Sequence, residues 1–156
     1  TLAGEPIASD VPMLEKWPEA MKARYGALGK VVLSAQGIAR DDKAGREQYY
    51  RSMVNMFDAP CIILVCISRD NLVEYQMLDA GLITQSICLA ACDKGLGTCL
   101  LAAAARYPAE TRKLATVPAD QKIVVGIALG YPDPSYPLNT FERERASLDE
   151  FVNWLD

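Results

Sequence analysis

A predicted central helix with a long uncharged stretch sets the first requirement on the fold. The sequence predicts a helix over residues 73–94, and no charged residue occurs from Ala80 to Cys92. A helix that is apolar all round has no face to offer to water, so we expect it to be buried centrally. Gly95 ends it in the usual C-terminal position. Small side chains along it would let other backbones approach closely: Ala80, Gly81, Ser86, Ala90 and Ala91.

Two strands buried on both faces are predicted on either side of this helix. Cys61–Ile67 is a continuous apolar run, and Lys122–Leu129 is a second one, closed by Gly130. Gly97–Leu101 is a shorter and weaker strand candidate. This alternation of helices and strands indicates an α/β or α+β class. The buried helix and the two-sided strands need more partners than these elements supply. We therefore expect other residues of the same polypeptide, or another subunit, to complete the fold.

Residues 13–56 carry two predicted helices. The first runs over about residues 13–34, and the second, opened by Asp41 and Asp42, reaches about Met56. Both mix apolar and aromatic side chains with many charged ones. They could form a lid or an arm over a site, but partly buried surface helices are the simpler interpretation.

Apart from the strand Lys122–Leu129, the last third of the chain is predicted to contain short helices and an irregular stretch. Pro108 begins a helix that ends near Leu114. Residues 131–139 hold three prolines and therefore cannot be regular. Ser147 can cap a last helix, which would carry the apolar residues Leu148, Phe151, Val152 and Trp154.

Length and charge exclude several classes of partner. The 156 residues suit a single domain, residues 1–156, with a real core. The net charge is −4 and the Lys and Arg residues form no stripe, which argues against nucleic-acid binding. The longest apolar run is far too short to cross a bilayer, so no membrane is expected.

The five cysteines are odd in number and lie in apolar runs, which indicates reduced thiols in a cytoplasmic protein.

The chain has no histidine, and this narrows the chemistry. Cys88 and Cys92 would share a helix face, but without CxxC or histidine they are better interpreted as core residues than as metal ligands. The absence excludes Ser-His-Asp and Cys-His nucleophilic chemistry, His-ligated zinc and histidine acid–base catalysis within this chain. Any catalysis must use carboxylates, Lys, Tyr, backbone dipoles or a cofactor, which favours a cofactor with its own reactivity.

Three ordered stretches resemble the nitroreductase family. The first is Phe57–Pro60, which leads into the apolar strand. The second runs from Asp79 to Cys99 and includes Gln85, Leu89-Ala90-Ala91 and Gly95-Leu96-Gly97-Thr98. The third runs from Ile127 to Pro134 and is followed by Asn139, Arg145 and Leu148–Phe151. Each stretch is weak alone, but their order and spacing make the combination specific. Residues 13–56 resemble the insert of the branch that acts on nitroaromatic compounds.

The resemblance implies a fold, a cofactor and a reaction. The fold is α+β, with a central, mostly antiparallel sheet flanked by helices, and an obligate homodimer forms around the buried central helix. Each of two interface sites holds FMN. A hydride passes from NADH or NADPH to the flavin, which then reduces a small aromatic acceptor, such as a nitroaromatic or a quinone, by a ping-pong route. Few side chains act directly, which agrees with the absence of histidine.

The resemblance also implies flavin-contacting residues. The backbone of Leu100, Leu101, Ala102 and Ala103 would pass the flavin ring, with the Ala102 N–H, joined by that of Ala103, directed at N5 and O4. Arg145 matches the position that contacts the FMN phosphate, and Arg143 lies two residues away. Without the resemblance, the alanines would be interpreted as a packing segment and the arginines as surface charges.

The family's N-terminal Arg-Ser-x-Arg and Asn-x-Gln-Pro-Trp types of sequence do not occur here. The chain is therefore expected to lack the segment that holds much of the FMN phosphate and ribityl chain, and to bind FMN poorly as given. Two alternatives stay open beside the reductase. One is a dimeric remnant or binding module of the same fold without flavin. The other is a flavin enzyme of this fold with a different reaction, such as dehalogenation or flavin fragmentation.

Overall fold

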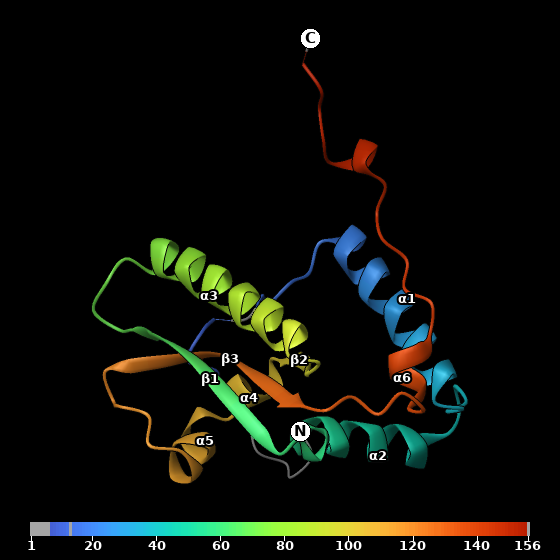
Figure 1. Ribbon diagram of the computed structural model, residues 1–156, viewed down its shortest axis with the longest axis horizontal. Helices are drawn as coiled ribbons and strands as arrows, with labels where there is room; N and C mark the ends of the chain where they lie inside the picture. The colour runs from blue at the N-terminus through green and yellow to red at the C-terminus, as the bar shows by residue number, and fades with distance from the viewer. Residues whose placement is uncertain (1–6, 13, 156) are drawn as a thin grey trace.

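The computed structural model describes residues 7–12 and 14–155. Within them, three strands form one antiparallel sheet in the order β1-β3-β2, as Figure 1 shows. The strands are β1 (Cys61–Ser68), β2 (Gly97–Leu101) and β3 (Gln121–Gly130). All three predicted strands are present, and the antiparallel sheet with its helices confirms the α+β class.

Strand β3 is the centre of the core because it is paired along both edges. Ile123 and Ile127 have no exposed surface, and Ile127 packs in a cluster with Val65, Ile67 and Ala80. The pairing with β1 runs from Cys61 opposite Leu129 to Ser68 opposite Gln121, with a shift in register after Val65. A bulge of this kind bends the edge strand and increases its twist.

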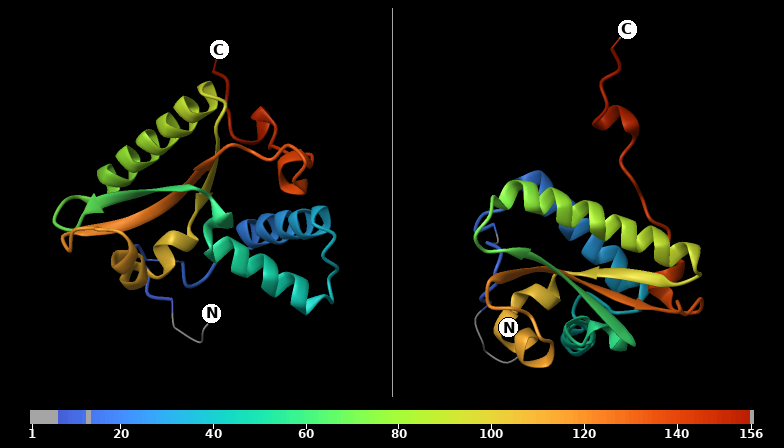
Figure 2. Two further views of the ribbon diagram at one scale, coloured as in Figure 1. Left: turned by 60° about the horizontal axis from the view of Figure 1, so that its bottom comes forward. Right: turned by 60° about the vertical axis from the view of Figure 1, so that its left-hand side comes forward.

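Helices cover the two faces of the sheet differently (Figure 2). One face carries α3 (Val73–Asp93). The other carries two short helices, α4 (Ala103–Arg106) and α5 (Pro108–Leu114). Neighbouring residues of β3 serve the two faces in turn, since Ile127 packs in the cluster that contains Ala80 of α3 and Gly126 lies against Ala104 of α4.

Helix α3 buries only one of its sides in the single chain. Ala80, Thr84 and Ala91 are its buried residues. At 3.6 residues per turn, Leu78 and Leu82 point the opposite way, and they are 58% and 59% exposed. The prediction of burial on all sides is therefore met on one face only, because within the described residues the sheet is the one surface against which α3 packs.

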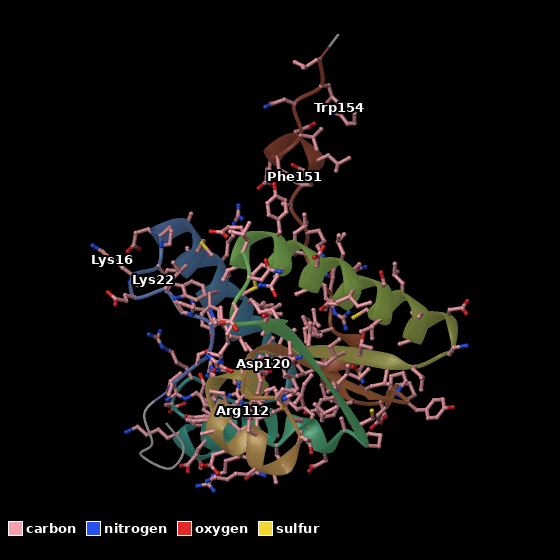
Figure 3. The ribbon with its side chains drawn as sticks, turned by 90° about the vertical axis from the view of Figure 1, so that its left-hand side faces the viewer. Lys16, Lys22, Arg112, Asp120, Phe151 and Trp154 are labelled. Carbon is pink, nitrogen blue, oxygen red and sulfur yellow. The ribbon has the colours of Figure 1, made fainter. Side chains whose placement is uncertain are left out.

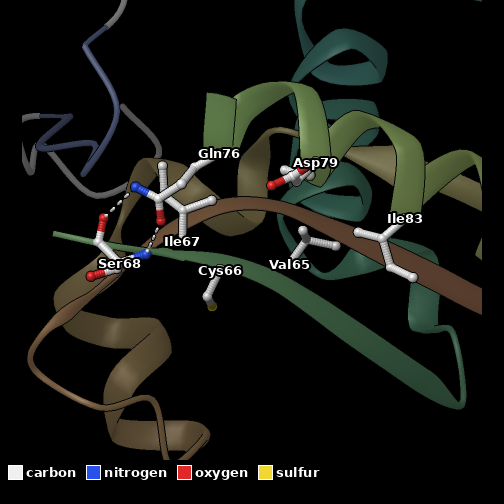
Figure 4. A pocket seen from close by; sticks show the side chains of 8 residues that line it. Val65, Cys66, Ile67, Ser68, Gln76, Asp79 and Ile83 are labelled. Carbon is white, nitrogen blue, oxygen red and sulfur yellow. Dashed lines mark hydrogen bonds between the residues drawn. The ribbon is translucent and has the colours of Figure 1, made fainter. Parts of the chain in front are cut away.

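Both ends of α3 are fixed by specific contacts. At its start, the Gln76 side chain accepts a hydrogen bond from the Ser68 N–H (2.7 Å) and donates one to the Ser68 carbonyl (3.3 Å), as Figure 4 shows. At its end, Gly95 has a φ of +69° and its N–H donates to the Cys92 carbonyl at 3.0 Å. The position of Gly95 after the helix is confirmed, and its φ explains why glycine is suited to it.

Helices α1 (Glu19–Ala35) and α2 (Lys43–Val54) form a hairpin beside one end of the sheet (Figure 1). Helix α1 begins after Pro18, later than predicted, and Met13 lies outside the described residues. The Asp42 side chain caps α2 by accepting from the Gly45 N–H at 2.8 Å. Neither helix contains a buried residue, which agrees with surface helices.

Helix α2 ends at Val54 and not near Met56, because the backbone changes hand. Met56, Phe57 and Asp58 all have φ between 53° and 54°, and they form the short turn η1 (Met56–Asp58). A right-handed helix cannot continue through residues in the left-handed region.

Two predictions for the C-terminal part are wrong. Residues 131–139 are not wholly irregular, because Pro137 starts the short helix α6 (Pro137–Thr140), where proline is tolerated. The predicted last helix is only the turn η2 (Leu148–Glu150), although Ser147 and Glu150 do form a capping box. This segment leaves the body of the molecule (Figure 3), so no surface is present to hold a longer amphipathic helix. Phe151 and Trp154 are accordingly 67% and 75% exposed.

No helix in the part of the chain that the structure describes is both long and apolar enough to span a membrane.

Candidate functional site

The segment from Leu100 to Ala103 turns from β2 into α4 at an accessible edge of the fold. Leu101 is 4% exposed and Ala103 is 9% exposed, whereas Ala102 between them is exposed. The Ala102 carbonyl accepts from the Ala105 N–H at 3.0 Å. In the described part of the chain, no hydrogen bond outside the helices and strands uses the Ala102 N–H as donor. This N–H is therefore not used as a donor by the loops and turns that the structure describes.

Close packing beneath α4 fixes where this segment lies. A Cβ added at Gly126 would stand 2.5 Å from the Ala104 Cβ, which is closer than real Cβ contacts allow. The glycine thus lets α4 approach the backbone of β3 directly. Ala104 is 1% exposed and Ala105 is 5% exposed, so small side chains are required on both partners. The packing role of the alanines and their proposed backbone role are compatible.

Aromatic side chains of α2 lie near β2 and α4. Tyr49 is half-buried and packs its ring against those of Tyr50 and Phe57, at centroid distances of 6.1 Å and 6.2 Å. Burial raises the pKa of the Tyr49 phenol, and nearby groups that include Cys99 of β2 raise it further. The phenol therefore stays protonated, as a hydrogen-bond donor, at neutral pH. The sequence analysis assigned Tyr49 no role, because no motif of the chain includes it.

The buried carboxylate of Asp10 connects the N-terminal segment, residues 7–12, to α5 and to the start of β3. Asp10 accepts hydrogen bonds from Arg69 (2.6 Å), from Arg112 (2.6 Å) and from the Ile123 N–H (3.0 Å), and its side chain is 8% exposed. We call these four residues the Asp10 clasp.

The charge state of Asp10 follows from this environment. Burial raises the pKa of the carboxyl, but the hydrogen bonds from Arg112, the Ile123 N–H and Arg69, with the charge of Arg112, outweigh burial. Together they lower the pKa to about 2. Asp10 is therefore ionised at any physiological pH.

The two arginines expected at a phosphate lie on the C-terminal segment and are exposed. Arg143 donates to the Leu138 carbonyl at 3.3 Å and lies over the Phe141 ring at 5.3 Å. Arg145 donates to the carbonyl of its neighbour Glu144 at 2.9 Å. Because the segment after α6 leaves the sheet (Figure 1), the described part of one chain does not gather these arginines around Ala102.

Two hollows on the surface lie elsewhere. One of about 290 Å³ separates β1 from α3, and Gln76, Asp79 and Ile83 line it with residues 65–68 (Figure 4). The other, of about 510 Å³, lies beside Ile62 and Leu64 of β1 and residues 115–118. Ala102 lines neither hollow, and in the single chain it is an exposed residue between β2 and α4. No group of three metal-ligating side chains occurs among the residues that the structure describes.

Two proteins of known activity are similar in sequence to most of this chain. A 4-nitrobenzoate reductase of Nocardioides sp. (strain LMS-CY) is 31% identical over 145 residues, which are 92% of this chain and 58% of that protein. A chloronitrobenzene nitroreductase of Comamonas testosteroni is 30% identical over 144 residues, 92% of this chain and 61% of that protein. The chain thus spans 58% and 61% of the length of these two relatives.

Solved structures share the fold. An FMN and NADPH-dependent nitroreductase NfnB from sphigopyxis sp. strain HMH is 30% identical, with a TM-score of 0.84 over 96% of this chain and 67% of that one. Residues 13–131, which include β2, α4 and the exposed Ala102, match the Nitroreductase family. The chain therefore belongs to the Nitroreductase family.

Proposed function

We propose that the whole protein is an FMN-dependent oxidoreductase that uses NADH or NADPH to reduce a nitroaromatic, a quinone or a similar small acceptor by a ping-pong route. The observation that carries the proposal is the exposed residue Ala102 between two buried neighbours, whose N–H donates no hydrogen bond outside the helices and strands of the described residues. It lies within the residues that match the family. A solved relative described as FMN and NADPH-dependent adds support for the cofactor and the electron donor.

The residues present fit a flavin ring at this edge. The flavin, when bound, would supply the hydride and electron chemistry, which no side chain here provides. The Ala102 N–H would donate a hydrogen bond to N5, and the small side chains of Ala102 and Ala103 leave room for a flat ring. Such a donor is held by the backbone, so it stabilises an electron-rich acceptor without reorganising. Arg145 would hold the phosphate, assisted by Arg143.

We infer that two copies build each site. One copy leaves Ala102 open and holds Arg145 on a segment that extends away from it. A second copy against the exposed side of α3 would enclose the edge. In this arrangement, residues 13–56, with Tyr49 near β2, would act as a lid over the acceptor. The five free cysteines support a reducing compartment, and we place the protein in the cytoplasm.

Flavin uptake is the direct test. The protein at its natural full length should be yellow, and the flavin absorption should bleach when NADH or NADPH is added anaerobically. Re-oxidation by a panel of nitroaromatics and quinones would then identify the acceptor class. A colourless protein that cannot be reconstituted with FMN would favour the flavin-free alternative. A flavin that is reduced but passes electrons to none of these acceptors would favour a different reaction on the same fold.

Ala102→Pro isolates the proposed amide. Ala102 has a φ of −61°, which proline adopts, and it follows the extended strand β2, which suits the residue before a proline. The substitution should therefore remove the N–H with little strain. We expect slower flavin reduction at a nearly unchanged urea midpoint, and an unchanged reduction rate would contradict the role of this amide.

Arg145→Ala tests the phosphate contact. We expect FMN binding to weaken by roughly 1.5–3 kcal/mol, the usual size of a hydrogen bond to a charged group. Lys113→Ala is the matched control, because this exposed lysine pairs with Glu110 on α5. FMN affinity equal in Arg145→Ala and the control would show that Arg145 does not hold the phosphate.

A further inference from the structure

The Asp10 clasp acts on α5, and α5 is tied to α4. Thr111, which precedes Arg112 of the clasp, donates its hydroxyl to the Ala104 carbonyl at 2.9 Å and contacts the Tyr107 carbonyl at 3.2 Å. Arg112 also donates to the carbonyl of Gln121 at the start of β3, at 2.6 Å. The Asp10 clasp thus fixes the position of α5 against the sheet, and the Thr111 hydrogen bond connects α5 to α4.

The N-terminal segment reaches α4 directly as well. Ala8, two residues before Asp10, donates its N–H to the carbonyl of Arg106, the last residue of α4, at 3.2 Å. Residues 7–12 have no helix or strand structure of their own. Their placement therefore rests on this hydrogen bond and on Asp10, whose carboxylate accepts hydrogen bonds from three donors.

Helix α4 has little of its own to hold it in place. It contains four residues, and its N-cap, Ala102, has no side chain that could cap it. A helix this short is not stable by itself. Its buried alanine methyls contribute little apolar area. The orientation of α4 therefore rests on its contact with Gly126 and on the polar contacts at its C-terminal end.

We propose that Asp10 is a positioning residue for the Ala102 amide. Through Arg112 and Thr111, and through the Ala8–Arg106 hydrogen bond, the clasp holds α4 at the angle that directs the N–H at its first turn toward the flavin. This role rests on the proposed function. Asp10 does not touch the flavin in this arrangement. A displacement of about 1 Å at a reacting group is enough to slow a reaction by roughly a hundredfold, so the distant carboxylate has a measurable effect.

The first experiment uses hydrogen exchange in the flavin-free protein. In Asp10→Asn, the hydrogen-bonded amides of Ala8 and Ala105 should exchange roughly tenfold faster, the factor that corresponds to about 1.4 kcal/mol, while that of Ile127 in β3 changes much less. Glu47→Gln is the matched control, because Glu47 forms an exposed ion pair with Arg51 at 2.7 Å. Exchange of the Ala8 and Ala105 amides that is unchanged, or that rises only in step with Ile127, would overturn the proposal.

The second experiment uses the flavin-loaded protein at its natural full length. Asp10→Asn should shift the reduction potential of the bound flavin to a more negative value, because a misdirected donor stabilises the reduced ring less. Reduction by NADPH should slow by roughly tenfold. The fold-change in FMN affinity should be much smaller than the fold-change in this rate. A potential and a rate equal to those of the parent protein would show that the clasp is only structural.

The two possible failures are distinguishable. A parent protein that takes up no flavin would overturn the proposed function and, with it, this role of Asp10. A parent that binds and reduces flavin normally, beside an Asp10→Asn variant that behaves identically, would overturn the role of Asp10 alone. If Asp10→Asn fails to fold, Arg69→Gln replaces it, because this side chain is 37% exposed and its loss is milder. It should change exchange and potential in the same direction by smaller amounts.

Discussion

Asp10 makes the stability of the fold depend on pH in the acid range. Its pKa is about 2 in the folded protein and 3.8 in the absence of these contacts. A carboxyl whose pKa is lowered by folding contributes stability above its unfolded pKa, and this contribution disappears as the pH falls through the folded value. The contribution of Asp10 is therefore complete at neutral pH and lost between about pH 4 and pH 2.

We expect the parent protein to lose about 2 kcal/mol of unfolding free energy over this range through Asp10 alone. Asp10→Asn should be less stable at pH 7 and should show a flatter decline on acidification. Urea titrations at a series of pH values measure both curves. Parallel curves for the two proteins would contradict the assignment.

Gly126 is a second single residue on which the site depends. Gly126→Ala would place a Cβ 2.5 Å from that of Ala104, so α4 must move. We expect the unfolding free energy to fall by roughly 1–3 kcal/mol, as in other overpacked cores. Gly26→Ala on α1 is the control, because nothing lies within 4 Å of its new Cβ. That change should stabilise by about 0.5–1 kcal/mol, and a similar gain at Gly126 would refute the close approach.

Single residues of this kind are only partly predictable from sequence. A role for Ala102 can be proposed from the sequence because a recognisable order of motifs surrounds it. Asp10 was not, because its three donors lie 59, 102 and 113 residues away in sequence. No local pattern marks an acidic residue whose partners are brought together only by the sheet and by α5.

Strands and helices were predictable where their periodicity is strong. The apolar runs that became β1 and β3, and helix α3 with its uncharged stretch from Ala80 to Cys92, appear at the expected places, because burial dictates their composition. The predicted C-terminal helix did not form, because burial is missing there. Its apolar residues have no surface to pack on in the single chain, so only the capping box at Ser147 formed.

The turn η1 was not predictable, because none of its residues is glycine. Met56, Phe57 and Asp58 adopt positive φ in succession, and the Asn55 side-chain amide hydrogen-bonds the Asp58 carboxylate across the turn. Packing of Phe57 on Tyr49 and these local hydrogen bonds offset a conformation that ordinary residues avoid.

We expect Asp58→Val to lower the unfolding free energy by roughly 1–2 kcal/mol, since a β-branched residue fits the left-handed region poorly. Asp58→Asn should change it by less than about 0.5 kcal/mol, because asparagine tolerates this region and keeps an oxygen that can accept from Asn55. Urea denaturation of both variants gives the comparison. Equal losses in the two would show that the carboxylate, and not the backbone, is decisive.

The whole molecule is incomplete on the outer side of α3. The sequence indicated burial all round, whereas one chain covers only the side of Ala80, Thr84 and Ala91. The opposite side carries apolar residues at helical spacing, Tyr75, Leu78, Leu82 and Leu89, each more than half exposed, with the polar Gln85 and Ser86 between Leu82 and Leu89. A largely apolar exposed face of this kind on a helix is typical of a protein interface. A second copy that presents the same face would satisfy the composition that the single chain leaves unexplained.

Leu82→Glu therefore tests the assembly. The parent protein should sediment as a dimer, and Leu82→Glu should shift it toward monomer, because a carboxylate would be desolvated opposite its own copy across a two-fold axis. Leu114→Glu is the control, since Leu114 is 91% exposed on α5, across the sheet from α3.

If the dimer also encloses the edge at Ala102, monomeric Leu82→Glu should lose FMN affinity in proportion to dimer loss and regain it at high protein concentration. A parent protein that is monomeric at every concentration, or a Leu82→Glu variant that stays dimeric, would refute this use of α3.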